Sequence, residues 1–487
     1  MKREIRIEEE AMRCLLCIDA PCSKACKNGD PARAIRAIRF DNRKLAGRWV
    51  ADMSDADLDA AESACIHYDR PIRIKEIVRK LEPASDDNYS VKSLEIDFCG
   101  IHCENPFFLA SSAICTNYEM VARAFEAGWG GVFFKTICMQ DINEVSPRFD
   151  AIGNHPHGDF FGFRNMEQLS ENPVREDFAT LKRLKKDYPS KIVIASIMGQ
   201  TERQWILLAQ MAERAGVDAV ELNFSCPQMR LAGMGSDVGQ NPEMVAFITA
   251  YVKRSVKLPV IPKMTPNITH INRPAMSAYF GGADAISAIN TIKSVTMGER
   301  GEVSSKKTIS GYSGRAIKPI AQRYIVEMTN NPLMKDVHFS GIGGIETWRD
   351  ALEYIQLGCQ NVQICTSVMQ YGYRIIDDLI LGMKVYMAER GVDRLEELVG
   401  EEKADVVAPK ELDRKTVVYP KFDYTKCMGC GRCYVSCMDG GHQALRFDDN
   451  RQPHLIGKNC VGCHLCRLVC PTGAISQGNR VTKAVKK

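Results

Sequence analysis

Between about residues 90 and 400 the chain alternates short apolar runs with longer amphipathic stretches. The runs have the length and composition of buried strands, whereas the stretches between them repeat apolar positions with the helical period. Eight strand-then-helix repeats over about 300 residues predict an α/β fold, a (β/α)₈ TIM barrel, rather than a doubly wound sheet. The predicted strands are Phe107–Ser111, Val132–Lys135, Ile192–Ile197, Ala219–Phe224, Val260–Met264, Ala285–Asn290, Val337–Gly341 and Val362–Cys365.

The helical pattern is clearest in four of the stretches between the predicted strands. The sequence of the chain contains no dinucleotide-binding motif. No G-x-G in the chain completes G-x-G-x-x-G, so a Rossmann domain is not indicated. A barrel instead predicts that the active-site groups lie at or just after the C-terminal ends of its strands. The four segments are Tyr118–Ala127, Glu202–Ala215, Pro242–Val256 and Thr347–Leu357.

Two charged, weakly apolar stretches flank this block and read as linkers. They lie at about Glu82–Tyr89 and Glu401–Lys415. We therefore expect three domains, over residues 1–85, 90–400 and 416–487.

Composition narrows the class of protein. A net charge of +4 over 487 residues argues against nucleic acid as the main partner. No apolar run approaches the roughly 18 residues of a membrane span, so we expect no membrane partner. The charged start, MKREIRIEEE, lacks the apolar segment of a signal peptide and predicts a cytoplasmic protein. Twenty cysteines in a reducing compartment indicate metal ligation before disulfides.

Eight cysteines near the end of the chain form two runs with the spacing C-x₂-C-x₂-C-x₃-C. In such pairs three thiolates wrap one [4Fe–4S] cluster, and the fourth reaches across to the other cluster. Zinc is the alternative, but it needs one set of four ligands, not two interleaved sets. Met438 stands where the first run would usually have proline. The expected sets are Cys427, Cys430, Cys433 and Cys470 for one cluster, and Cys460, Cys463, Cys466 and Cys437 for the other.

Clusters of this kind pass single electrons. A ferredoxin-like module fused to a barrel therefore implies a barrel cofactor that handles one and two electrons, and flavin fits that role.

Cys226 is the candidate proton donor or acceptor. It lies in ELNFSCP, at the end of the fourth predicted strand, and the Gly- and Met-rich loop Gln228–Gly239 follows. A thiol in that position can face a bound ring. The alternative is a buried, inert cysteine, as we expect for Cys99, Cys103, Cys115, Cys138 and Cys359.

Several strings in this block closely resemble dihydropyrimidine dehydrogenases and, less closely, the wider dihydroorotate dehydrogenase family of flavin barrels. The likeness runs from about residue 90 to 390 and continues through the ferredoxin-like module. The strings are NPFFLASS (105–112), FEAGWGGVFFKT (125–136), IVIASIM (192–198), ELNFSCP (221–227), PKMTPN (262–267), AINT (288–291), SGRAIKPIA (313–321) and GIGGI (341–345).

The resemblance implies FMN at the mouth of the barrel. A cationic Lys263 near the flavin would stabilise its reduced, anionic form. Glycine-rich turns after the late strands suit the phosphate. Residues implied at the isoalloxazine and ribityl chain are Ala110, Ser111, Lys135, Thr136, Asn223, Lys263 and Thr291; those implied at the phosphate are Gly314, Gly343, Gly344, Cys365 and Thr366.

The resemblance also implies a pyrimidine base as substrate. Asparagine amides each offer a donor and an acceptor, which suits the alternating N–H and C=O edge of a pyrimidine-dione. Hydride would pass between FMN and C6 of uracil or thymine, while Cys226 transfers the proton at C5. Dihydroorotate and a non-catalytic electron-transfer scaffold are the alternatives. The implied substrate residues are Asn165, Glu167, Asn223, Asn290 and Thr291.

The N-terminal cysteines read C-x₂-C-x₄-C-x₃-C, and Cys65 follows. They resemble the helical iron–sulfur domain of the same dehydrogenases, which normally holds two clusters. Asp57 and Ala61 occupy two of the expected cysteine positions, so we expect one cluster, with Cys26 left over. Cys26 as the fourth ligand, zinc, or a vestigial domain are the alternatives. The expected ligands are Cys14, Cys17, Cys22 and Cys65.

Related full-length enzymes continue from this domain into FAD- and NADPH-binding domains, which we do not find in this sequence. We therefore expect electrons to come from a separate partner, either an NAD(P)H-oxidising flavoprotein or a ferredoxin. The resemblance suggests a homodimer or a heterotetramer. The sequence leaves open the choice between uracil and thymine and the direction of the reaction.

Overall fold

The structure is a computed structural model, and it describes residues 6–82, 89–152, 161–227, 229, 233–296 and 307–483. Its contacts divide the chain into two units, Met1–Ala404 and Asp405–Lys487. Most of the predicted linker Glu82–Tyr89 and part of the predicted loop Gln228–Gly239 lie outside the described residues. Within the described residues, no helix is both long and apolar enough to cross a membrane.

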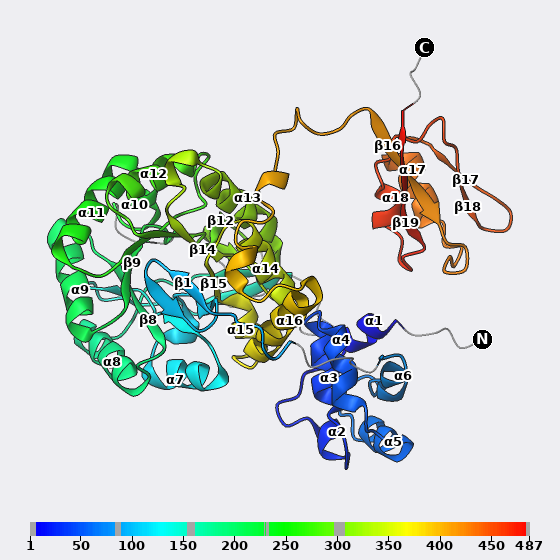
Figure 1. The fold of residues 1–487 in the computed structure, drawn as a ribbon, viewed down its shortest axis with the longest axis horizontal. Helices are drawn as coiled ribbons and strands as arrows, with labels where there is room; N and C mark the ends of the chain where they lie inside the picture. The colour runs from blue at the N-terminus through cyan, green and yellow to red at the C-terminus, as the bar shows by residue number, and fades with distance from the viewer. Residues whose placement is uncertain are drawn as a thin grey trace. The chain divides into compact units, whose positions relative to one another are not determined.

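A closed barrel of parallel strands forms the centre of the first unit, as the sequence predicted (Figure 1). Each predicted apolar run overlaps one barrel strand, with ends that differ by no more than two residues, and β4 pairs with both β3 and β8 to close the ring. The barrel strands are β3 (Phe107–Leu109), β4 (Gly131–Phe133), β8 (Ile192–Met198), β9 (Ala219–Asn223), β10 (Val260–Lys263), β11 (Ala285–Ala288), β14 (His338–Ile342) and β15 (Asn361–Ile364).

Amphipathic helices surround these strands, with buried apolar faces turned to the sheet. Their ends follow local chemistry: Asn117 caps α7 by accepting from the Met120 amide, and Gly128 ends it at φ +113°. The helices are α7 (Tyr118–Ala127), α8 (Val174–Asp187), α9 (Glu202–Ala215), α10 (Ser236–Gly239), α11 (Pro242–Ser255), α12 (Asn272–Phe280), α13 (Lys318–Thr329), α14 (Trp348–Gln356), α15 (Thr366–Tyr371) and α16 (Ile375–Arg390).

A layer of polar side chains lies inside the barrel, below the strand ends. Such interiors are usually filled by branched apolar residues. Here the buried set on β8, β9, β11, β14 and β15 includes a fully buried carboxylate. Its members are Ser196, Glu221, Ser287, Ser340 and Gln363.

Small additional strands complete the first unit. The hairpin β1 (Ile96–Phe98) and β2 (Ile101–Cys103) precedes the barrel, and β5 (Ile137–Cys138) extends the sheet beside β8. An antiparallel sheet, in the order β12-β13-β7-β6, is built from loops that follow the barrel strands. Its strands are β6 (Phe149–Ile152), β7 (Gly162–Asn165), β12 (Ile292–Ser294) and β13 (Ser310–Ser313).

The N-terminal residues form short helices that pack around Ile35, Leu58 and Ile77. They are α1 (Ile7–Met12), α2 (Pro21–Lys24), α3 (Pro31–Arg39), α4 (Arg43–Ala46), α5 (Asp55–Ser63) and α6 (Ile74–Val78).

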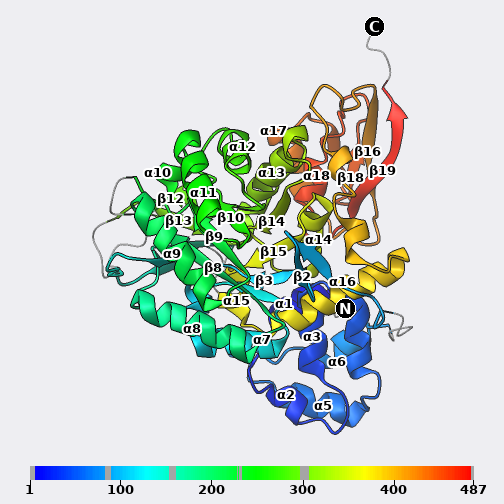
Figure 2. The same ribbon diagram turned by 60° about the vertical axis from the view of Figure 1, so that its left-hand side comes forward.

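This helical region is fixed to the last helices of the barrel, as Figure 2 shows for α3 and α16. The Asn42 amide donates to the Asp378 carbonyl at 2.7 Å, and the Trp348 indole donates to the Asp41 carbonyl at 3.0 Å. A Cβ at Gly382 would lie 2.0 Å from the Trp348 ring and 2.3 Å from the Asn42 side chain. Only glycine therefore permits this approach.

The second unit, described by itself, is a small two-layer module. Strands β16 (Thr416–Phe422) and β19 (Ile475–Thr482) pair antiparallel, with a register shift between Val418 and Pro420. Helices α17 (Arg432–Gly440) and α18 (Leu465–Leu468) pack together, and β17 (Leu445–Phe447) pairs with β18 (Pro453–Leu455). Its core includes the thiols of Cys433, Cys437 and Cys466.

Candidate active site and cluster cavities

A cavity of about 1030 Å³ lies at the C-terminal ends of the barrel strands. This is where a barrel places an active site. All the residues implied by the resemblance at the flavin, the substrate and the proton-transfer position line this one cavity. They are Ala110, Ser111, Lys135, Thr136, Asn165, Glu167, Asn223, Cys226, Lys263, Asn290, Thr291, Gly314, Gly343, Gly344, Cys365 and Thr366.

One end of the cavity is shaped by glycine backbone. Gly314, Gly343 and Gly344 have φ values of +86°, +132° and +70°. A Cβ at Gly344 would lie 2.9 Å from the Lys318 amide nitrogen and 3.0 Å from the Gly314 carbonyl oxygen. Backbone N–H groups gathered in this way suit an anion, so this end fits the phosphate of FMN.

The cationic side chains of the cavity have carboxylate partners. The Lys135 ammonium lies 2.8 Å from Glu167, and Arg148 holds the other Glu167 oxygen at 3.4 Å. Lys263 lies 3.7 Å from Glu221. Because Lys135, Lys263 and Glu221 are nearly fully buried, these charges interact with little screening by water.

A chain of hydrogen bonds orients two of the candidate substrate-binding amides. The Asn290 amide donates to the Ser225 hydroxyl at 2.9 Å, and Ser225 donates to the Asn223 carbonyl oxygen at 2.8 Å. Backbone N–H groups of Ser225 and Thr291 also donate to the side-chain oxygens of Asn223 and Asn290. Since those donors cannot reverse, the orientation of both amides is fixed before any ligand binds.

Cys226 lies in the loop after β9, with 5% of its surface exposed, and lines the cavity. The Ser236 amide donates to its carbonyl at 2.9 Å, where the chain enters α10. A Cβ at Gly235 would lie 2.3 Å from that carbonyl oxygen, so glycine is needed for the turn. Two other cysteines of the barrel are deeply buried, and burial raises the pKa of the Cys115 thiol to about 12 and that of Cys138 to about 11.

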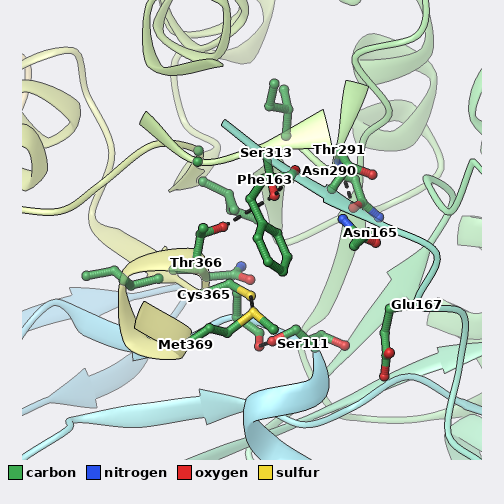
Figure 3. Close-up of a pocket in the computed structure, with 18 of the residues that line it drawn as sticks. Ser111, Phe163, Asn165, Glu167, Asn290, Thr291, Ser313, Cys365, Thr366 and Met369 are labelled. Atoms are coloured by element: carbon green, nitrogen blue, oxygen red, sulfur yellow. Dashed lines mark hydrogen bonds between the residues drawn. The ribbon is translucent and has the colours of Figure 1, made fainter. Parts of the chain in front are cut away.

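The sequence missed part of the lining. Phe149 and Phe163, whose ring centroids lie 5.2 Å apart, come from the antiparallel sheet β12-β13-β7-β6. In Figure 3 the Phe163 ring points into the cavity, and Ser313 of the same sheet accepts a hydrogen bond from Thr366 at 3.3 Å. The short loop strands that carry these side chains have no regular apolar pattern, so no periodicity predicted them.

Two cavities of the C-terminal module gather the cysteines in the interleaved sets that the spacing predicts. One, of about 390 Å³, is lined by Cys427, Cys430, Cys433 and Cys470. The other, of about 350 Å³, is lined by Cys437, Cys460, Cys463 and Cys466. Across the described ranges, no three His, Cys, Asp or Glu side chains converge as closely as a single metal ion requires. Thiols spread around a cavity fit a larger, cubane-type cluster.

A third cysteine-lined cavity, of about 400 Å³, lies in the helical region. Cys26 is not among its lining residues; its thiol donates to the carbonyls of Cys22 at 3.1 Å and Asp57 at 3.5 Å. The cysteines that line the cavity are Cys14, Cys17, Cys22 and Cys65.

Comparison with known proteins agrees with this geometry. The sequence model of the dihydroorotate dehydrogenase family matches residues 93–387, and that of the 4Fe-4S dicluster domain matches residues 421–477. The chain belongs to the dihydroorotate dehydrogenase family, and it is an oxidoreductase that uses FMN in the barrel and [4Fe–4S] clusters in the C-terminal module.

The chain is also similar to individual proteins of known name. It is 51% identical over 394 residues, 80% of this chain and 96% of the relative, to the NAD-dependent dihydropyrimidine dehydrogenase subunit PreA of Escherichia coli (strain K12). It is 36% identical over 328 residues, 64% of this chain and 77% of the relative, to the chloroplastic dihydropyrimidine dehydrogenase (NADP(+)) of Arabidopsis thaliana. It is 35% identical over 313 residues, 63% of this chain and 98% of the relative, to the dihydroorotate dehydrogenase B (NAD(+)) catalytic subunit of Pyrococcus abyssi.

Proposed function

We propose that the protein interconverts uracil or thymine with the corresponding 5,6-dihydropyrimidine. The observation that carries the proposal is the grouping, in one cavity, of oriented asparagine amides, a paired carboxylate and a loop thiol. The amides offer donors and acceptors that match the N–H and C=O edge of a pyrimidine-dione. The similarity to dihydropyrimidine dehydrogenases supports the same substrate class.

Each group then has a defined task. FMN, when bound, supplies the two-electron chemistry at C6 of the pyrimidine ring. Asn165, Asn223 and Asn290 bind and orient the ring, and Glu167 accepts a ring N–H. Cys226 gives a proton to C5 during reduction and takes it back during oxidation. The buried setting of the thiol excludes water from that position.

The charges of the cavity favour a neutral base over dihydroorotate. An orotate carboxylate would need positive charge to receive it. The described Lys and Arg residues that line the cavity are Lys135, Lys263 and Arg315, and each already has a carboxylate within 4 Å. The partner of Arg315 is Glu346, at 3.7 Å.

We propose a third cluster in the helical region, held by Cys14, Cys17, Cys22 and Cys65. Its cavity, about 400 Å³, has the size of the two C-terminal ones, about 390 and 350 Å³, and is likewise lined by thiols. The position of Cys26 outside that cavity supports Cys65 as the fourth ligand. Purified protein should contain about 12 iron atoms per chain, whereas about 8 would exclude this cluster.

Electrons for the reaction would come from a separate partner, an NAD(P)H-oxidising flavoprotein or a ferredoxin, and pass through the C-terminal clusters to FMN. The name of the E. coli relative, an NAD-dependent enzyme subunit, supports a flavoprotein partner and a heteromeric assembly. A reducing cytoplasm would keep the thiols available as ligands.

Anaerobic titration of the purified protein tests the substrate. Dihydrouracil and dihydrothymine should bleach the flavin absorbance, and dihydroorotate should not. Bleaching by dihydroorotate alone would overturn the assignment.

A Cys226→Ala variant tests the proton-transfer step. It should bind flavin and uracil normally and lose at least about 100-fold in turnover, as expected for removal of a general acid. Cys138→Ala is the matched control, because that nearby thiol has no assigned role. Near-normal turnover of Cys226→Ala would remove Cys226 from the mechanism.

A further inference from the structure

Glu221 is a buried carboxylate that the mechanism above does not use. It has 0% of its surface exposed and does not line the cavity. It points into the polar layer inside the barrel, on the strand that ends in Asn223. An isolated carboxylate in that position is costly, so its charge needs specific partners.

Both carboxylate oxygens accept hydrogen bonds from hydroxyl groups. Ser196 donates to one oxygen at 2.8 Å, and Ser287 donates to the other at 2.9 Å. A protonated carboxyl would present a donor on one side, whereas a carboxylate accepts on both sides, as Glu221 does here.

The hydrogen bonds beyond Ser196 also run toward Glu221 as an acceptor. Because the Ser196 proton goes to Glu221, Ser196 accepts from the Thr136 hydroxyl at 2.9 Å, and Thr136 in turn accepts from the Asn223 amide at 2.9 Å. Asn223 accepts from Ser225, which accepts from Asn290. Every donor along this chain is therefore directed toward Glu221, which is its terminal acceptor.

Glu221 also faces a cation. The Lys263 ammonium lies 3.7 Å from its Oε1 atom, and both side chains are nearly fully buried. On the far side Lys263 lines the cavity. The lysine thus stands between the carboxylate and the flavin position, and its charge acts on both.

We propose that Glu221 is a positioning residue, the buried counter-charge that keeps Lys263 protonated at the flavin in both oxidation states. The inference rests on the proposed function only in placing Lys263 beside the flavin ring. Without the carboxylate, a buried ammonium would have no counter-charge at this position, and the neutral amine would be the less costly form. Reduction of the flavin to an anion would then draw a proton onto the lysine.

The test is Glu221→Gln in the full holoenzyme. A glutamine keeps the shape and can still accept from Ser196, while it removes the charge and presents an amide donor to the Ser287 hydroxyl. We expect the variant to take up as much as one additional proton per two-electron flavin reduction, measured as a steeper fall of the flavin midpoint potential with pH. Wild-type protein should show no such addition.

Glu104→Gln is the matched control. Glu104 pairs with Lys191 at the N-terminal ends of β3 and β8, away from the cavity, so its loss should leave the flavin potential unchanged at every pH. If Glu221→Gln matches wild type in potential and pH slope, the counter-charge role is wrong, while the proposed function stands. If wild-type protein binds no flavin, the proposed function itself fails.

Ser287→Ala keeps the test decisive if Glu221→Gln does not fold. It leaves the carboxylate in place and removes one of its two donors, so the anion is less stabilised. We expect this variant also to take up more protons than wild type on flavin reduction. The increase should be smaller than in Glu221→Gln and should occur at lower pH. Proton uptake equal to wild type would contradict the proposal.

Discussion

The two cysteine-rich regions reach the same kind of cavity by different routes. In the C-terminal module each cavity is built from two short loops, where Gly429, Gly431 and Gly462 adopt positive φ so that neighbouring thiols turn inward. In the helical region three thiols come from one segment, and Cys65 is brought to them by the packing of α5 and α6. The first kind of site is encoded locally, whereas the second depends on the packing of helices that are separate in the sequence.

The surroundings differ as well. The loop that carries Cys14 and Cys17 is held by two guanidinium groups: Arg39 donates to the Cys14 carbonyl at 2.6 Å, and Arg374 of the barrel donates to the Leu16 carbonyl at 2.5 Å. The N-terminal cavity is therefore tied to the barrel itself. Its integrity should depend on contacts that lie far from any cysteine in the sequence.

The largest effect should come from a C-terminal ligand. Cys433→Ser should remove about four iron atoms and slow flavin reduction by an electron-donating partner at least tenfold, since a relay site is lost. Flavin bleaching by dihydrouracil, which needs no cluster, should persist. Cys22→Ser should leave the C-terminal clusters intact, and iron analysis with rapid mixing checks both variants. Equal and complete loss of iron in both would mean that the regions are not independent.

Cys65→Ser and Cys26→Ser separate the two possible ligand sets of the helical region. Cys65→Ser should lower the iron content from about 12 to about 8 atoms per chain, because four thiolates are required. Cys26→Ser should leave it unchanged, since that thiol lies outside the cavity. The opposite pattern would make Cys26 the ligand.

Arg374→Gln tests the tie to the barrel. Loss of a charged hydrogen bond to the cysteine loop should weaken that loop by about 1–2 kcal/mol, seen as faster amide exchange around residues 14–17. Arg349→Gln is the control at the same interface, because its pair with Asp41 at 2.6 Å is exposed and should contribute little. Unchanged exchange in Arg374→Gln would show that the helical domain holds the loop alone.

Asp57 offers the smallest and most specific test. Hydrogen bonds from Ser54 and from the Lys27 amide hold its pKa down at about 2. A lowered pKa adds stability that is complete above the unfolded value of about 3.9 and is lost as pH falls toward 2. Asp57→Ala should therefore lower the melting temperature of the helical region by the same few degrees at pH 7 and pH 5. A difference in melting temperature between variant and wild type that was smaller at pH 5 than at pH 7 would contradict the lowered pKa of Asp57.

The sequence predicted the barrel and the C-terminal ligands because both are periodic. Apolar runs such as Ile192–Ile197 mark strands, and evenly spaced cysteines mark a loop that folds on itself. The position of Cys65 beside Cys14 was available only through family resemblance, since no local spacing encodes it. The polar layer around Glu221 and the sheet that carries Phe163 were not predicted, because each arises where distant loops and strands meet.

Gly382 carries a consequence for how such a chain can diversify. A side chain there would collide with Asn42 and Trp348, so the outer surface of α16 is complementary in shape to the helical region. The helical region is thus not an accessory that recombination could append to any barrel of this family. Gain or loss of the helical region would require coordinated change at this helix, because residue 382 can carry a side chain only where Asn42 and Trp348 do not lie against it.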